Sequence, residues 1–158
     1  MIGPEFIAPY TISNIVSVVL LVSAYRWPRI SRILFVLIFL IAGLFNIYTA
    51  MTESEAYLFY GDMAVLEPYR HFIHGFFSIH TQEIVLAIAL GQLCVAALLS
   101  FKGKLFKLGI VGGVIFFIAI TPLGIGSAFP ATLLMAIALI TMHYQLVKRR
   151  DKDAYLIT

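Results

Sequence analysis

Three histidines and a glutamate with metal-binding chemistry lie close together near the middle of the chain. His71 and His74 are three residues apart, and His80 and Glu83 repeat that spacing. Residues three apart on a helix share a face, so each pair would present two ligands of the kind that zinc and iron accept. The spacing matches neither HExxH nor the Glu-x-x-His pairs of di-iron bundles. A metal site formed by these four residues is therefore one hypothesis, and a solvated helix face that binds no metal is the alternative.

A second group of polar side chains interrupts stretches that are otherwise apolar. A strongly polar group inside a bilayer is costly, so it is expected to face the protein interior and to mark a functional site. If the apolar stretches are membrane helices, polar groups from several of them lie at one depth near the outer surface. They predict an outward-facing ligand site in which Glu83 is the only carboxylate. The residues of this site are Glu83, His80, Asn46, Asn14 and Tyr10. Hydrogen bonding between helices is the alternative interpretation.

Composition indicates which kind of fold would position these groups. Hydrophobic residues make up 61% of the 158 residues and charged residues only 12%, whereas soluble domains carry about 25% charged residues. These proportions exclude a disordered chain and argue against an ordinary water-soluble domain. The length fits one domain, and a single cysteine, Cys94, excludes an intrachain disulfide. We expect a lipid bilayer as the main partner, with a membrane-protein partner or a second copy of the chain as further candidates, and no nucleic acid.

Five apolar runs predict an all-α, polytopic membrane bundle. Each run is close to the ~20 residues that a helix needs to cross the hydrocarbon of a bilayer. Lipid offers the backbone no hydrogen-bond partners, so the runs should be helical. Pro122 and Pro130 bracket a connection short enough to be partly embedded, which leaves open whether the last two spans both cross fully. The predicted spans are 7–25, 31–51, 83–101, 105–123 and 128–147.

The basic residues predict the orientation of these spans. Cytoplasmic loops of membrane proteins carry an excess of lysine and arginine. The opposite loops of this chain hold Arg70 alone, together with several acidic residues. The rule therefore places the N-terminus outside and the C-terminus in the cytoplasm, in a plasma or inner membrane. The basic clusters are Arg26, Arg29 and Arg32; Lys102, Lys104 and Lys107; and Lys148, Arg149, Arg150 and Lys152.

The longest connection, 52–82, is predicted to carry an amphipathic helix on the outer surface. Pro68 suits the first turn of a helix, where its missing N–H has no partner to lose. The following apolar residues recur at i, i+3, i+4 and i+7, which favours a helix over Glu67–Ile79 lying on the membrane. Its apolar face is expected at Tyr69, Phe72, Ile73 and Phe76, with His71 and His74 on the opposite face.

Small and polar residues at helical spacing predict the faces on which the spans pack. Gly109 and Gly113 form a GxxxG pair, which is typical of close helix packing. Gln92 falls away from the stripe expected to face inward in 83–101 and is predicted to bond to another helix. That inward stripe is expected at Glu83, Ala87, Gly91, Cys94 and Leu98.

Two segments resemble a known group of membrane proteins. Arg32–Ile47 places an arginine before an apolar helix that ends in Ala42 and Gly43, and Glu83–Leu99 opens with glutamate and carries a glycine eight residues later. With a longish external loop between them, they resemble the DoxX-like group over about 32–147. The resemblance implies a four-helix core, to which the first span is an addition. It also implies a role sometimes tied to membrane redox chemistry or quinone-linked enzymes, with Glu83 matching the glutamate that opens the helix.

Three functions follow from these observations. The first is a non-catalytic integral membrane protein whose outward-facing polar pocket binds a small amphipathic ligand or a partner protein. The second is a membrane oxidoreductase, or its accessory subunit, with a His/Glu metal site or a quinone site. The third is an oligomeric channel or carrier, because the apolar inner halves of the spans oppose a pore through one copy. No nucleotide-binding or hydrolase motif is present.

Overall fold

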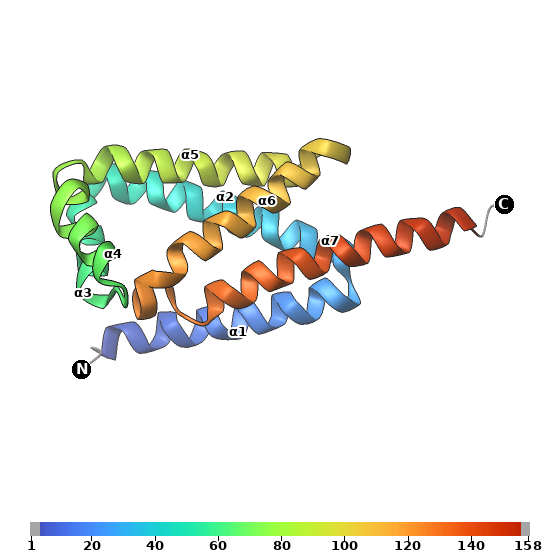
Figure 1. Ribbon diagram of the computed structural model, residues 1–158, viewed down its shortest axis with the longest axis horizontal. Helices are drawn as coiled ribbons and strands as arrows, with labels where there is room; N and C mark the ends of the chain where they lie inside the picture. The colour runs from blue at the N-terminus through green and yellow to red at the C-terminus, as the bar shows by residue number, and fades with distance from the viewer. Residues whose placement is uncertain (1–3, 156–158) are drawn as a thin grey trace.

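The computed structural model describes residues 4–155, and within that range every regular element is a helix. Five long helices run roughly side by side and shorter helical turns gather at one end of them (Figure 1). The all-helical class and the five long apolar helices expected from the sequence are therefore present. The long helices are α1 (Pro4–Arg26), α2 (Pro28–Thr52), α5 (Thr81–Ser100), α6 (Gly103–Ile120) and α7 (Ala131–Tyr155).

Each of the five long helices holds a segment long and apolar enough to cross a membrane. Their outer faces carry large apolar side chains without cover: Ile41 on α2 and Leu90 on α5 are both 63% exposed. α2 begins at Pro28, before the predicted span 31–51, because proline is well suited to the first helical turn. The fourth predicted span extends beyond α6 as a 3-10 segment, η3 (Thr121–Ser127), before α7 begins.

The helices pack in pairs around an apolar core. α2 lies against α5, α1 runs along α7, and α6 contacts both α5 and α7 (Figure 1). Aromatic rings fill the centre, where Phe39 and Phe117 lie 5.2 Å apart between ring centroids. The core cluster includes Leu20, Phe35, Phe39, Leu99, Phe106, Phe117, Leu139 and Met142.

Two glycines of α6 allow it to pack closely on its neighbours. A Cβ on Gly109 would lie 2.8 Å from the backbone nitrogen of Leu99 on α5, and a Cβ on Gly113 would lie 2.8 Å from a methyl group of Leu139 on α7. The predicted close packing of this GxxxG pair is therefore found, but each glycine faces a different helix.

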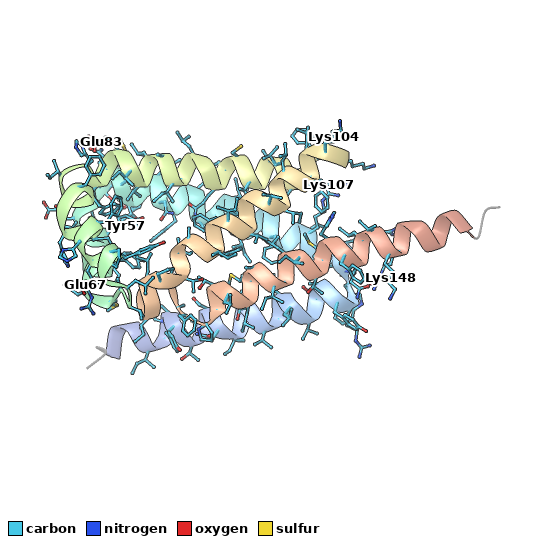
Figure 2. All side chains as sticks on the ribbon, in the orientation of Figure 1. Tyr57, Glu67, Glu83, Lys104, Lys107 and Lys148 are labelled. Atoms are coloured by element: carbon cyan, nitrogen blue, oxygen red, sulfur yellow. The ribbon has the colours of Figure 1, made fainter. Side chains whose placement is uncertain are left out.

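The two ends of the bundle differ in charge and in construction. One end, here called the basic end, has short turns: Trp27 alone joins α1 to α2, and 101–102 joins α5 to α6. Figure 2 places Lys104, Lys107 and Lys148 at this end and Glu67 and Glu83 at the other. The charge asymmetry seen in the sequence is thus an asymmetry between the two ends of the folded chain.

The opposite end is closed by the cap, residues 54–77 of the connection between α2 and α5. The cap consists of η1 (Ser54–Tyr57), α3 (Phe59–Met63), α4 (Glu67–Phe72) and η2 (Ile73–Phe77). Val65 N–H donates to the carbonyl of Pro122 (2.9 Å), and the Tyr69 hydroxyl donates to the carbonyl of Ala119 (2.8 Å). These bonds fasten the cap to the end of α6 and to η3.

The single helix predicted over Glu67–Ile79 is instead two segments. α4 ends at Phe72 and continues as the π turn η2, which is broken at Gly75 (φ −100°, ψ −106°). The extra residue in a π turn shifts the helical register. Ile73 is buried as the spacing predicts, but Phe77 takes the next buried position and Phe76 is exposed.

The inward face of α5 is the reverse of the predicted one. Glu83, Gly91 and Cys94 are exposed, and a Cβ on Gly91 would meet nothing within 4 Å. The prediction assumed that the acid and the small residues faced inward together. The buried face instead combines small and branched apolar residues with one hydroxyl and one amide: Thr81, Val85, Ala89, Gln92, Val95, Ala96 and Leu99.

Candidate ligand-binding cavity

A cavity of about 630 Å³ lies between the cap and the adjoining parts of the helices. Its size is in the range of pockets that enclose a small organic ligand, roughly 300–1,000 Å³. The walls come from α2, α5, α6, α7, η3 and the cap, with Ser13 of α1 also in the lining. Its floor toward the core includes Phe116 and Phe117, which pack on Phe39.

The lining is apolar with a few uncharged polar groups. Among the described residues, no Asp, Glu, Lys, Arg or His lines the cavity. The polar side chains that do so are amides, hydroxyls and phenols. The apolar walls include Ile84, Val85, Ile88, Ile120, Leu123 and Met135.

A chain of hydrogen bonds crosses the lining from the cap to α5. The Tyr57 hydroxyl, in η1, donates to Asn46 Oδ1 on α2 (2.7 Å). Asn46 Nδ2 in turn donates to Gln92 Oε1 on α5 (2.7 Å). The predicted bond from Gln92 to another helix is confirmed, and the partner is Asn46.

Gln92 is buried, but only one of its two side-chain polar atoms has a hydrogen-bond partner. Its side chain is 3% exposed and lines the cavity. Its Oε1 accepts from Asn46, while no group within residues 4–155 accepts from its Nε2. A buried amide normally has its donors paired, so two N–H groups are left available to the cavity.

Tyrosines of the cap close the cavity on its outer side. The rings of Tyr57 and Tyr60 stack with centroids 6.0 Å apart, and both line the cavity. Burial raises the pKa of the Tyr57 hydroxyl and that of Tyr60, where the proximity of Tyr57 acts in the same direction. Both hydroxyls are therefore neutral at physiological pH, in keeping with an uncharged lining.

Of the five residues predicted to bind a ligand, Asn46 alone is among the residues that line the cavity. Asn14 Nδ2 donates to the carbonyl of Tyr10 (2.9 Å) and to that of Ala128 (3.4 Å), so it links α1 to the connection between η3 and α7. His80 and Glu83 are exposed at the start of α5. The structure therefore does not bring the five together in one site.

The four predicted metal ligands are also dispersed. His71 lies 3.4 Å from Glu67, and His74 lies 3.2 Å from Asp62 in α3. The ring of His80 packs against that of Phe76, with centroids 4.8 Å apart. In the described part of the chain, no three His, Cys, Asp or Glu side chains lie close enough together to hold a metal ion.

Sequence reasoning missed most of the lining. No role was predicted for Tyr57 or Tyr60, although both line the cavity and Tyr57 provides one end of the polar chain. Gln92 carried a signal, because an amide in the middle of an apolar helix needs a partner. Pairing it with Asn46, at a similar distance along the neighbouring span, would have located the cavity.

Comparisons with known proteins add no relationship to this geometry. No protein-family model matches the chain, and neither a curated protein nor a solved structure matches it. The resemblance to the DoxX-like group therefore stays an expectation from the residues quoted for it.

Proposed function

We propose that this chain is an integral membrane protein whose cavity binds a small amphipathic ligand near the outer surface of the bilayer. Five apolar helices with uncovered apolar outer faces support membrane insertion. The basic end supports an orientation with the N-terminus outside and the C-terminus in the cytoplasm, by the positive-inside rule. The cap would then lie on the outer side of a plasma or inner membrane.

The observation that carries the ligand-binding role is the cavity itself. It is partly open and measures about 630 Å³, within the range of roughly 300–1,000 Å³ found for pockets that bind small organic ligands. Its apolar walls suit a hydrocarbon body, and the polar chain through Asn46 and Gln92 suits one polar group. That combination matches an amphipathic molecule better than water or an ion.

The other functions have less support from the geometry. A metal-based oxidoreductase needs converging ligands, and His71, His74 and His80 lie beside different partners. A quinone site remains compatible with the cavity, because a quinone is itself an amphipathic ligand. A pore through one copy would have to pass the apolar core, in which Phe35, Phe39 and Leu139 are fully buried.

Identification of bound molecules tests the ligand-binding role. The protein is released from its native membrane in mild detergent and examined by native mass spectrometry. Ala42, on the cavity wall, is replaced by Phe to fill the space, and Ala87, exposed on α5, is replaced by Phe as the control. We expect a bound amphiphile on the wild-type protein and on Ala87→Phe, but not on Ala42→Phe. Equal occupancy of all three proteins, or none on any, would refute the proposal.

Labelling of introduced cysteines tests the orientation. In a Cys94→Ala background, a membrane-impermeant thiol reagent added to intact cells should label Glu67→Cys in the cap. It should label Lys104→Cys at the basic end only after the cells are opened. Labelling of position 104 from outside would overturn the proposed orientation.

A further inference from the structure

The cavity excludes charged ligand groups. A buried charge is costly unless an opposite charge or several hydrogen bonds compensate it. Among the described residues that line the cavity, none is acidic, basic or a histidine. A carboxylate, phosphate or quaternary ammonium group placed here would therefore lack an ion-pair partner.

The hydrogen bonds of the polar chain all run from the cap toward α5, and this leaves the donors of the last residue, Gln92, unused. The Tyr57 hydroxyl donates to Asn46, and Asn46 donates to Gln92. The amide oxygens of Asn46 and Gln92 are thus both accepting. What remains is the Nε2 group of Gln92, which has two N–H donors and no acceptor within residues 4–155.

A ligand that completes this chain must supply an acceptor. A carbonyl oxygen has two lone pairs and no proton, so it can receive from Gln92 without leaving a donor of its own unpaired. A hydroxyl can also accept from Gln92, and its own proton can be received by the second lone pair of an amide oxygen or by a lining hydroxyl such as that of Thr132. The polar chain therefore favours an uncharged acceptor, a carbonyl or a hydroxyl, over a quaternary ammonium group, which accepts no hydrogen bond.

We infer that the cavity is selective for an uncharged amphiphile whose polar group accepts a hydrogen bond, with Gln92 Nε2 as its donor and the apolar walls around its hydrocarbon body. The inference rests on the proposed ligand-binding function and adds the chemical class of the ligand. Gln92 is then the residue that determines specificity, and Tyr57 sets the direction of the hydrogen-bond chain.

A matched series of probes tests the selectivity. The full-length protein in lipid nanodiscs is photolabelled with a dodecyl methyl ketone that carries a diazirine at the far end of its chain. Four unlabelled competitors share the dodecyl chain and differ in the polar group: a methyl ketone, a primary alcohol, a carboxylate and a trimethylammonium. Peptide mapping should locate the label on cavity-lining residues of α5, α6 or α7. The ketone and the alcohol should each compete about tenfold better than the carboxylate and the trimethylammonium, because the cavity offers a buried charge no ion-pair partner.

The outcomes separate this inference from the proposed function. Labelling of the cavity with equal competition by all four probes would overturn the selectivity and leave the binding role intact. Strongest competition by the carboxylate or the ammonium would also overturn it. Absence of any label from the cavity lining would refute both proposals.

Substitution of Gln92 tests the proposed donor directly. Gln92→Leu removes the donor and should weaken competition by the ketone about tenfold, while Gln82→Leu, exposed on the same helix, should leave it unchanged. If Gln92→Leu fails to fold, the four competitors on the wild-type protein still decide the matter: charged probes that compete as well as the ketone contradict the inference.

Discussion

The two ends of this bundle are built on different principles. At the basic end the turns are short, and arginine side chains donate hydrogen bonds to backbone carbonyl groups where helices end. Arg32 donates from Nε to the carbonyl of Leu99 (2.6 Å) and from a terminal nitrogen to that of Phe101. Arg149 donates to the carbonyl of Arg26 at the end of α1 (2.9 Å). Cations at helix C-termini satisfy carbonyls that have no partner within the helix.

At the cap end the connections are long and irregular and they enclose space. The backbone departs from helical geometry at Gly75 in η2 and at Gly124 in η3, where φ is +64°. Polar side chains bond across helices here, as Asn46 does with Gln92. The comparison indicates that one half of the molecule maintains the bundle while the other half forms a cavity, so substitutions in the two halves should have different consequences.

The largest loss of stability is expected from Gly109→Ala near the basic end. The added Cβ would lie 2.8 Å from the backbone nitrogen of Leu99, and helix backbone cannot move aside as a side chain can. Overpacking of this kind should lower the free energy of unfolding by about 3 kcal/mol. Unfolding of the detergent-solubilised protein by SDS would measure it. Gly91→Ala, with open space around the new methyl group, should be neutral, and equal losses in both variants would contradict the packing described.

Arg32→Met should cost somewhat less. The substitution removes two hydrogen bonds to carbonyls at the end of α5 and the contact of the guanidinium with the Phe106 ring, 4.7 Å from its centroid. We expect a loss of about 2 kcal/mol, typical of charge-assisted bonds. The matched variant Arg29→Met, exposed on the same helix, should unfold like the wild type. An unaltered unfolding curve for Arg32→Met would show that the basic end is held together in some other way.

Gly124→Ala should have a smaller effect that is confined to the cap end. Its φ of +64° with ψ of −127° is a glycine conformation, and the new Cβ would lie 2.8 Å from the carbonyl oxygen of Met63. The strain should cost about 1 kcal/mol. Hydrogen exchange should become faster in the cap, 54–77, and stay unchanged around Leu99. Faster exchange at both ends would argue that the two halves unfold as one unit.

The smallest effect is expected from alkaline pH on the cap. Because burial raises the pKa values of Tyr57 and Tyr60, the folded state keeps both protons at a pH where unfolded tyrosines lose theirs. Their contribution to stability is complete below the unfolded pKa of about 10 and is lost as pH rises through the folded values. Tyr57→Phe should make the decline in stability above pH ~10 shallower. Tyr48→Phe, exposed on α2, should leave that decline as it is.

The sequence predicted the helices well because length and hydrophobicity alone determine them. It also predicted that Gln92 bonds to another helix, since an amide in an apolar helix has few alternatives. The face of α5 was predicted wrongly, because a carboxylate at the start of a helix was treated as an interior group. Glu83 lies in the first turn of α5, where a carboxylate complements the helix dipole without entering the bundle.

The cap could not be predicted from periodicity. Its register changes at the π turn after Phe72, and the sequence around Gly75 gives no signal that distinguishes a π turn from a regular helix. The positions of Tyr57 and Tyr60 depend on that fold and on η3, where a Cβ on Gly126 would lie 2.5 Å from the Tyr60 ring. The cavity is bounded in part by the irregular segments η1, η2 and η3. It depends on contacts between residues far apart in the chain, and a helical pattern does not encode such contacts.

An experimental structure of the protein in a lipid nanodisc would test the ligand-binding cavity most directly. The account predicts elongated non-protein density between the cap and Phe117, with one end within hydrogen-bond distance of Gln92 Nε2. A cavity closed by movement of Phe116 or Tyr60, with Gln92 Nε2 bonded to another protein group, would contradict it.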